Sequence, residues 1–88
     1  MKRDILNSLS EILDQRKQAS PDESYTAKLF NDGSDSILKK VGEEATEAII
    51  ASKSGDNGAI IHEVADLWFH TLVLLKYHDL DHSDVLNE

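Results

Sequence analysis

The chain has 88 residues with no cysteine, and its 17 acidic and 9 basic residues give a formal net charge of −8. A chain this small buries a modest core and usually depends on disulfides, a metal or a partner subunit. The absence of cysteine excludes disulfides, thiolate zinc sites and cysteine nucleophiles, which leaves a metal held by oxygen or nitrogen, or oligomerisation. The acidic balance argues against nucleic acid as a partner, because phosphate backbones require a basic face.

The N-terminus does not resemble a secretory signal. Met1-Lys2-Arg3 is followed at once by a polar amphipathic stretch, and the longest apolar run is far shorter than the ~18 residues that span a membrane. We therefore expect a soluble cytoplasmic protein with no membrane partner.

The N-terminal third of the sequence predicts two helices. The first carries one apolar stripe at helical spacing and fades over the polar residues 15–18; the stripe consists of Ile5, Leu6, Leu9, Ile12 and Leu13. The second is expected from about Pro21 to Phe30. Ser20 and Glu23 would form a capping box around the permitted proline, and Asn31-Asp32-Gly33 would end the helix.

The remainder predicts two longer helices joined by a tight turn. The third helix would be capped by Asp32 or Ser34 and run to about Ser52, and residues 54–58 give the strongest turn signal. The fourth would run from about Gly58 to Tyr77, with one last turn over 83–88. No strand pattern is found. The sequence thus predicts a single all-α domain over residues 1–88, an antiparallel helical bundle of four to five helices.

The fourth helix is apolar almost all round between residues 64 and 75, which is typical of a helix buried on every side. An 88-residue chain has few other elements to surround it. We predict that part of this surface, including Leu67, Trp68, Leu74 or Leu75, packs against a second subunit in a homodimer or higher homo-oligomer that completes the bundle. The alternative is that the first two helices cover it within a monomer.

Two acidic pairs lie on the third and fourth helices. Glu44 and Glu47 are three residues apart, as are Glu63 and Asp66, so each pair occupies one helix face. Because a short turn near Gly55 makes the helices antiparallel neighbours, position 47 should face 63 and position 44 should face 66.

Four carboxylates at one level repel one another unless a cation is present. Hard oxygen ligands without cysteine favour Mg²⁺, with Mn²⁺ as the alternative, over zinc. The sequence therefore predicts a metal site made by Glu44, Glu47, Glu63 and Asp66. The competing interpretation is that these residues are charges on a solvated face.

Two further side chains share these helix faces. Lys40 lies on the stripe of Glu44 and Glu47, where it could hold a phosphate or form a surface ion pair with Glu44. His70 follows Asp66 by four residues, and it could support the site through a hydrogen bond or be a satisfied buried histidine.

Residues 39–48 (KKVGEEATEA) and 63–70 (EVADLWFH) resemble the phosphoribosyl-ATP pyrophosphatase family of histidine biosynthesis, which belongs to the all-α nucleotide pyrophosphohydrolases. The superfamily signature, EExxE followed by ExxD, stands here without a gap. The flanking residues 24–29 and 70–75 match as well, so the resemblance extends from about Ile5 to Leu75.

The resemblance implies Mg²⁺-dependent hydrolysis of phosphoribosyl-ATP to phosphoribosyl-AMP and pyrophosphate. It also implies a dimer, and an enzyme that is not fused to the cyclohydrolase of the next step in the pathway. It implies the same four metal ligands, and it would put Glu43 at the edge of the site as an outer-sphere ligand or a helper for the attacking water. Either Glu44 or Glu47 would act as the general base. Tyr25 and Thr26 lie in the segment that would cover the substrate, where Tyr25 either stacks on the nucleoside or is a core residue.

Two other functions remain to be distinguished from this one. The first is a house-cleaning pyrophosphatase of non-standard or deoxy nucleotide triphosphates, which shares the acidic motif but not the flanking sequences KKVG and ADLWFH. The second is a non-enzymatic helical dimerisation module whose acidic residues are only a solvated face.

Overall fold

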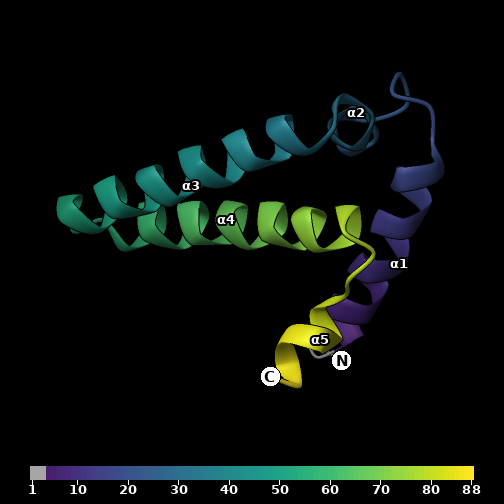
Figure 1. The fold of residues 1–88 in the computed structure, drawn as a ribbon. Coiled ribbons are helices and arrows are strands. Elements are labelled where there is room, and N and C mark those ends of the chain that lie inside the picture. The colour runs from purple at the N-terminus through teal and green to yellow at the C-terminus, as the bar shows by residue number, and fades with distance from the viewer. Residues whose placement is uncertain (1–3) are drawn as a thin grey trace.

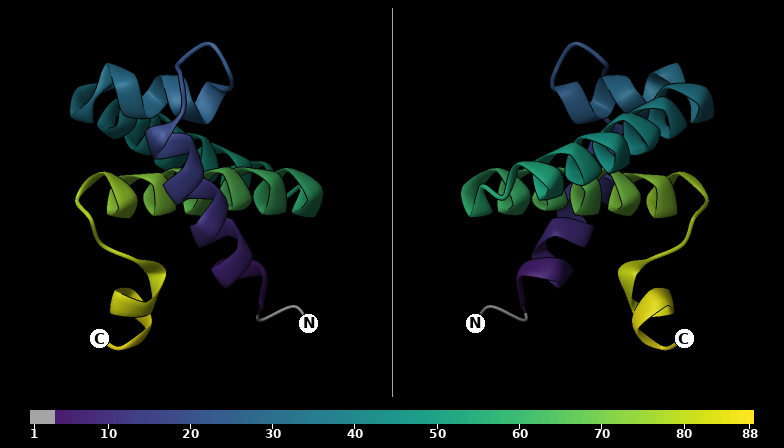
Figure 2. Two further views of the ribbon diagram at one scale, coloured as in Figure 1. Left: turned by 90° about the vertical axis from the view of Figure 1, so that its right-hand side faces the viewer. Right: turned by 90° about the vertical axis from the view of Figure 1, so that its left-hand side faces the viewer.

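The computed structural model describes residues 4–88, and within that range its regular secondary structure is all helical, as expected. The long helices α3 (Ser34–Ser54) and α4 (Asn57–Tyr77) form an antiparallel hairpin. The helix α1 (Asp4–Gln18) crosses the end of α4 that lies opposite the turn, and the short α2 (Tyr25–Asp32) lies over the same end (Figures 1 and 2). A last short helix, α5 (His82–Leu86), begins near α1, where His82 Nε2 lies 3.1 Å from Asn7 Oδ1.

The hairpin turn follows the sequence signals closely. Gly55 ends α3 in the left-handed conformation at φ 75°, which glycine adopts without strain. Asp56 then caps α4, its side chain accepting a hydrogen bond from the Ala59 N–H at 3.3 Å. These local signals hold the two long helices side by side.

The predicted start of the second helix was wrong. Residues 20–23 form a turn, closed by the Glu23 N–H donating to the Ser20 carbonyl at 3.0 Å. The helix begins only at Tyr25, because Ser24 is the cap and accepts a hydrogen bond from the Ala27 N–H. The expected caps of α3 were also wrong: Asp32 still belongs to α2 and Ser34 to α3, and Gly33 joins the two helices at φ 98°.

The core lies where α1 and α2 meet the hairpin, away from its turn. Each of the four longer helices contributes to one buried cluster, which consists of Leu13, Leu29, Phe30, Ile37 and Val73. Near the turn the hairpin has no such cover, and Ile49, Ile50 and Ile61 are each more than 60% exposed. The chain by itself is therefore a hairpin covered at one end, and not a closed bundle.

The helix α4 is long and apolar enough to span a membrane by length and composition, with a mean hydropathy of 1.3 over its most apolar 18 residues. From the sequence, no membrane-spanning segment was expected. Because this helix packs along α3 and carries Glu63 and Asp66 on its inner face, it is better explained as a central helix of a helical domain.

Candidate active site

The carboxylates of the hairpin meet at one point between α3 and α4. Glu44, Glu63 and Asp66 each bring one carboxylate oxygen to within 4.8 Å of the other two. Glu44 is buried at 5% exposure, and Glu63 and Asp66 are half-buried. Three of the four predicted ligands therefore lie together, as the register of the hairpin requires.

Glu47 stands at the edge of this group. It is exposed, and its carboxyl lies beside that of Glu63. A hydrogen bond between the two carboxyls requires one of them to hold a proton, which raises the pKa of Glu47, and the charge of Glu63 acts in the same direction. Glu44 and Lys40 oppose the shift. Glu47 thus adjoins the cluster without belonging to its buried centre.

Two carboxylate oxygens in this cluster are buried and lack protein partners. Among the residues that the structure describes, no hydrogen bond reaches Glu44 Oε2 or Glu63 Oε2. Burying a charged oxygen without a partner is costly, and a coordinated cation removes that cost. The donor set is all carboxylate, which suits a hard divalent cation. The residues present therefore fit a metal site of the predicted kind.

Lys40 lies one turn before Glu44 and balances part of this charge. Its Nζ is 3.5 Å from Glu44 Oε1 and 3.7 Å from Glu43 Oε1. The pKa of Lys40 is raised, most strongly by the phenol of Tyr25. Glu43 is half-exposed at the rim of the site. The ion pair with Glu44, one of the two alternatives for Lys40, is therefore present, and a third of the Lys40 side chain still faces solvent.

Tyr25 reaches the same site from α2. Its hydroxyl lies 3.0 Å from His70 Nε2, although 54% of the residue is exposed. Burial of the hydroxyl raises the pKa of Tyr25, and the neighbouring Lys40 counteracts the shift. Thr26 follows in the first turn of α2 and is half-buried, and none of the contacts described for residues 4–88 joins it to the carboxylates.

Open space borders Glu47 on both sides of α3. One cavity of about 310 Å³ is lined by Glu47 and Glu63, together with Ile50, Ala51, Ser54 and Ala59. A second, of about 520 Å³, is lined by Glu43, Thr46 and Glu47 and by apolar and basic neighbours. Solvent and a ligand can therefore approach the exposed acids of the motif.

Comparison with known proteins identifies the relatives of this chain. The family model described as phosphoribosyl-ATP pyrophosphohydrolase matches residues 6–88. The chain belongs to this family. Proteins named phosphoribosyl-ATP pyrophosphatase from Methylococcus capsulatus and Geobacter sulfurreducens are 56% and 58% identical over 97% of the chain, which covers 81% and 79% of their lengths. A third, from Chromobacterium violaceum, is 51% identical over the whole chain and 82% of its own length.

Membership of the phosphoribosyl-ATP pyrophosphohydrolase family confirms the resemblance read from the two acidic motifs. The matched residues include the whole hairpin, and hence both acidic pairs and Lys40, as well as Tyr25 at the start of α2.

Proposed function

We propose that this protein hydrolyses phosphoribosyl-ATP to phosphoribosyl-AMP and pyrophosphate, the second step of histidine biosynthesis, in the cytoplasm. The family match supports the reaction. The observation that carries the proposal is the group of three carboxylates with two unpartnered buried oxygens, contributed by both halves of the acidic motif. A solvated acidic face does not explain these oxygens, because solvated carboxylates are hydrogen-bonded to water.

We propose Mg²⁺ as the cation of this site, with Mn²⁺ as a substitute. Glu44, Glu63 and Asp66 would hold it, with Glu47 as the fourth ligand at the exposed side. When bound, the ion supplies positive charge for the phosphate oxygens and lowers the pKa of a bound water.

The exposure of the acidic residues indicates which of them acts as the general base. Glu44 is buried and paired with Lys40, whereas Glu47 is exposed beside open space and would hold the ion only from the edge of the cluster. One carboxylate oxygen of Glu47 would therefore stay free, which makes Glu47 the better general base for the attacking water. It takes the water's proton as the oxygen attacks phosphorus in the α–β linkage, and the anhydride bond at that phosphorus breaks to release phosphoribosyl-AMP and pyrophosphate. Glu43, at the rim of the site, would act as an outer-sphere ligand or help to orient the attacking water.

The substrate is placed by side chains above the carboxylates. The exposed third of Lys40 would stabilise charge that develops on the phosphates. Tyr25 offers an exposed ring to the nucleoside, and Thr26 lies beside it in the covering segment.

We further propose that the protein functions as a homodimer through the face of α4 that lies opposite the acidic residues. That face carries an apolar stripe with alternating spacings of four and three, as in a helix–helix seam: Ile61, Ala65, Trp68, Leu72 and Leu75. Ile61 is 70% exposed and Trp68 66% exposed. A second copy of the same stripe is the occupant that its self-complementary pattern fits.

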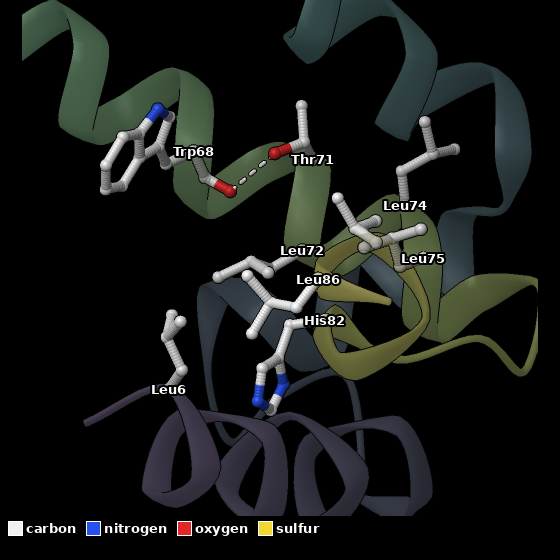
Figure 3. A pocket seen from close by; sticks show the side chains of 9 residues that line it. Leu6, Trp68, Thr71, Leu72, Leu74, Leu75, His82 and Leu86 are labelled. Carbon is white, nitrogen blue, oxygen red and sulfur yellow. Dashed lines mark hydrogen bonds between the residues drawn. The ribbon is translucent and has the colours of Figure 1, made fainter. Parts of the chain in front are cut away.

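The far end of the stripe opens into an apolar groove of about 440 Å³ (Figure 3). Leucines dominate its lining, with Trp68 at one end and Leu6 of α1 across from it. Of the four residues predicted to meet a second subunit, Trp68, Leu74 and Leu75 line the groove. Its lining offers little charge for a phosphorylated substrate, which is why we propose it for subunit contact.

The proposed reaction is tested by measuring pyrophosphate release from phosphoribosyl-ATP, with and without Mg²⁺, beside a panel of ordinary and deoxy nucleotide triphosphates. We expect Mg²⁺-dependent release from phosphoribosyl-ATP alone. Release from other nucleotides only would move the protein to the house-cleaning class. No release from any compound would return the carboxylates to a structural role.

The proposed dimer is tested by light scattering coupled to size-exclusion chromatography. Trp68→Glu should halve the mass measured for the wild type, because a charge in an apolar seam loses its hydration. Ile12→Glu, on an exposed position of α1 that does not line the groove, is the matched control and should leave the mass unchanged. A monomeric wild type would contradict the proposal.

A further inference from the structure

His70 is a buried histidine whose two ring nitrogens both have protein partners. It is 6% exposed, with Nδ1 2.8 Å from the carbonyl oxygen of Asp66 and Nε2 3.0 Å from the Tyr25 hydroxyl. A carbonyl only accepts, so Nδ1 carries the hydrogen. In the neutral ring, Nε2 is then an acceptor, and Tyr25 must donate to it. Neither nitrogen is left for a metal or a substrate.

This hydrogen bond links two helices that are otherwise joined by apolar packing. Within residues 4–88, it is the one side-chain hydrogen bond between α2 and α4. The rings of Tyr25 and His70 also meet edge to face, with their centroids 6.0 Å apart. Phe69 also meets the histidine edge to face, at 5.2 Å between centroids. The imidazole is thus held in one orientation, with its acceptor directed at Tyr25.

The position of Tyr25 gives this contact a functional consequence. Its hydroxyl is near enough to Lys40, Glu43, Glu44 and Asp66 for their charges to act on it, and His70 links it to the Asp66 carbonyl, while more than half of the residue remains exposed. Tyr25 is also the first residue of α2, where a helix is held least firmly by its own hydrogen bonds. The bond to His70 is what fixes the ring at the rim of the acidic site.

We propose that His70 is a positioning residue: by accepting the Tyr25 hydroxyl hydrogen, it holds the tyrosine ring as one wall of the substrate site. This inference rests on the proposed function, because it assigns the ring to the nucleoside side of the same site. His70 touches neither the substrate nor the reacting atoms. It acts on turnover only through Tyr25.

A double-mutant cycle in pyrophosphate release from phosphoribosyl-ATP tests the pair. Tyr25→Phe and His70→Leu should each raise KM by about five- to tenfold, the size of one lost hydrogen bond, with kcat within about twofold. The double variant should be no worse than either single variant, because each removes the same bond. His78→Leu, at an exposed histidine after α4, is the control and should match the wild type.

A conservative variant separates positioning from simple core packing. In His70→Gln the side-chain oxygen can take the place of Nε2 as an acceptor, so KM should return close to the wild-type value. A His70→Gln variant as impaired as His70→Leu, single effects that multiply in the double variant, or wild-type KM in both single variants would each overturn the proposal.

A second readout does not depend on activity. Long-range ¹H–¹⁵N spectra of the histidine rings should show His70 with its hydrogen on Nδ1, and Tyr25→Phe should shift its Nε2 resonance. A hydrogen on Nε2, or a spectrum unchanged by Tyr25→Phe, would overturn the pairing even if the wild type released no pyrophosphate. An active wild type with an unchanged KM in these variants would remove the positioning role and leave the proposed function standing.

Discussion

Replacing Lys40 with methionine should destabilise the metal-free protein, because it leaves the buried charge of Glu44 without its nearest cation. The Glu44 side chain is 6% exposed, and the ion pair spans 3.5 Å. At an effective dielectric constant of ~20, that distance corresponds to an attraction of about 5 kcal/mol. Lys40 is one-third exposed and keeps part of its hydration, so we expect a net loss of about 1–3 kcal/mol.

Thermal unfolding in EDTA, followed by circular dichroism at a fixed protein concentration, measures this loss. For a domain of this size each kcal/mol lowers Tm by about 4–8 °C. Glu44→Gln should restore Tm in the Lys40→Met background, because it removes the unpaired charge. Mg²⁺ should restore it as well, since a bound cation takes over the role of Lys40.

Lys39→Met is the matched control, since Lys39 is exposed one residue away, and its Tm should change little. Equal losses in Lys39→Met and Lys40→Met would refute the reasoning. So would a Lys40→Met variant that Glu44→Gln fails to restore, since the loss would then come from the lysine stem and not from the charge.

Three further outcomes are expected. Glu47→Ala and Asp66→Ala should each abolish pyrophosphate release while leaving the far-UV circular dichroism unchanged, whereas Glu11→Ala on the exposed side of α1 should leave both the release and the circular dichroism unchanged. Activity retained in Glu47→Ala or Asp66→Ala would contradict the proposed site. Addition of Mg²⁺ should raise the Tm of the wild type but not that of Asp66→Ala, and an equal rise in both would place the ion elsewhere. The Ser10 hydroxyl donates to Asp81 at 2.6 Å and holds the pKa of that carboxyl well below its ordinary 3.8. The ionised Asp81 therefore stabilises the fold fully above pH 3.8, and this stabilisation is lost as the pH falls below that value. The Tm of Asp81→Asn should fall less than that of the wild type between pH 5 and 2, and parallel curves would refute this.

The hairpin and its acidic cluster could be predicted from sequence because both follow from local rules. The turn residues Gly55 and Asp56 determine where α3 stops and α4 starts. A short turn makes the helices antiparallel, and the helical period then brings Glu44 opposite Asp66. No long-range information is needed for this register. The metal, the base and the dimer remain predictions that the proposed measurements test.

The start of α2 was mispredicted because two capping signals compete within five residues. Ser20 and Glu23 match a capping box, yet Ser24 caps the helix. Starting at Tyr25 lets Ala27, Leu29 and Phe30 face the core. A single cap contributes about 1 kcal/mol, which is less than the burial of three apolar side chains contributes.

The sequence by itself determined the helical class, the long hairpin and the meeting of its carboxylates, since each depends on residues near one another along the chain. Only the tertiary structure decided which distant side chains meet. Tyr25 and His70 are 45 residues apart, and Ser10 and Asp81 are 71 apart. These contacts depend on how α1 and α2 fold back over the end of the hairpin. That packing is set by the shape of the shared core around Ile37 and Val73, which no local pattern encodes.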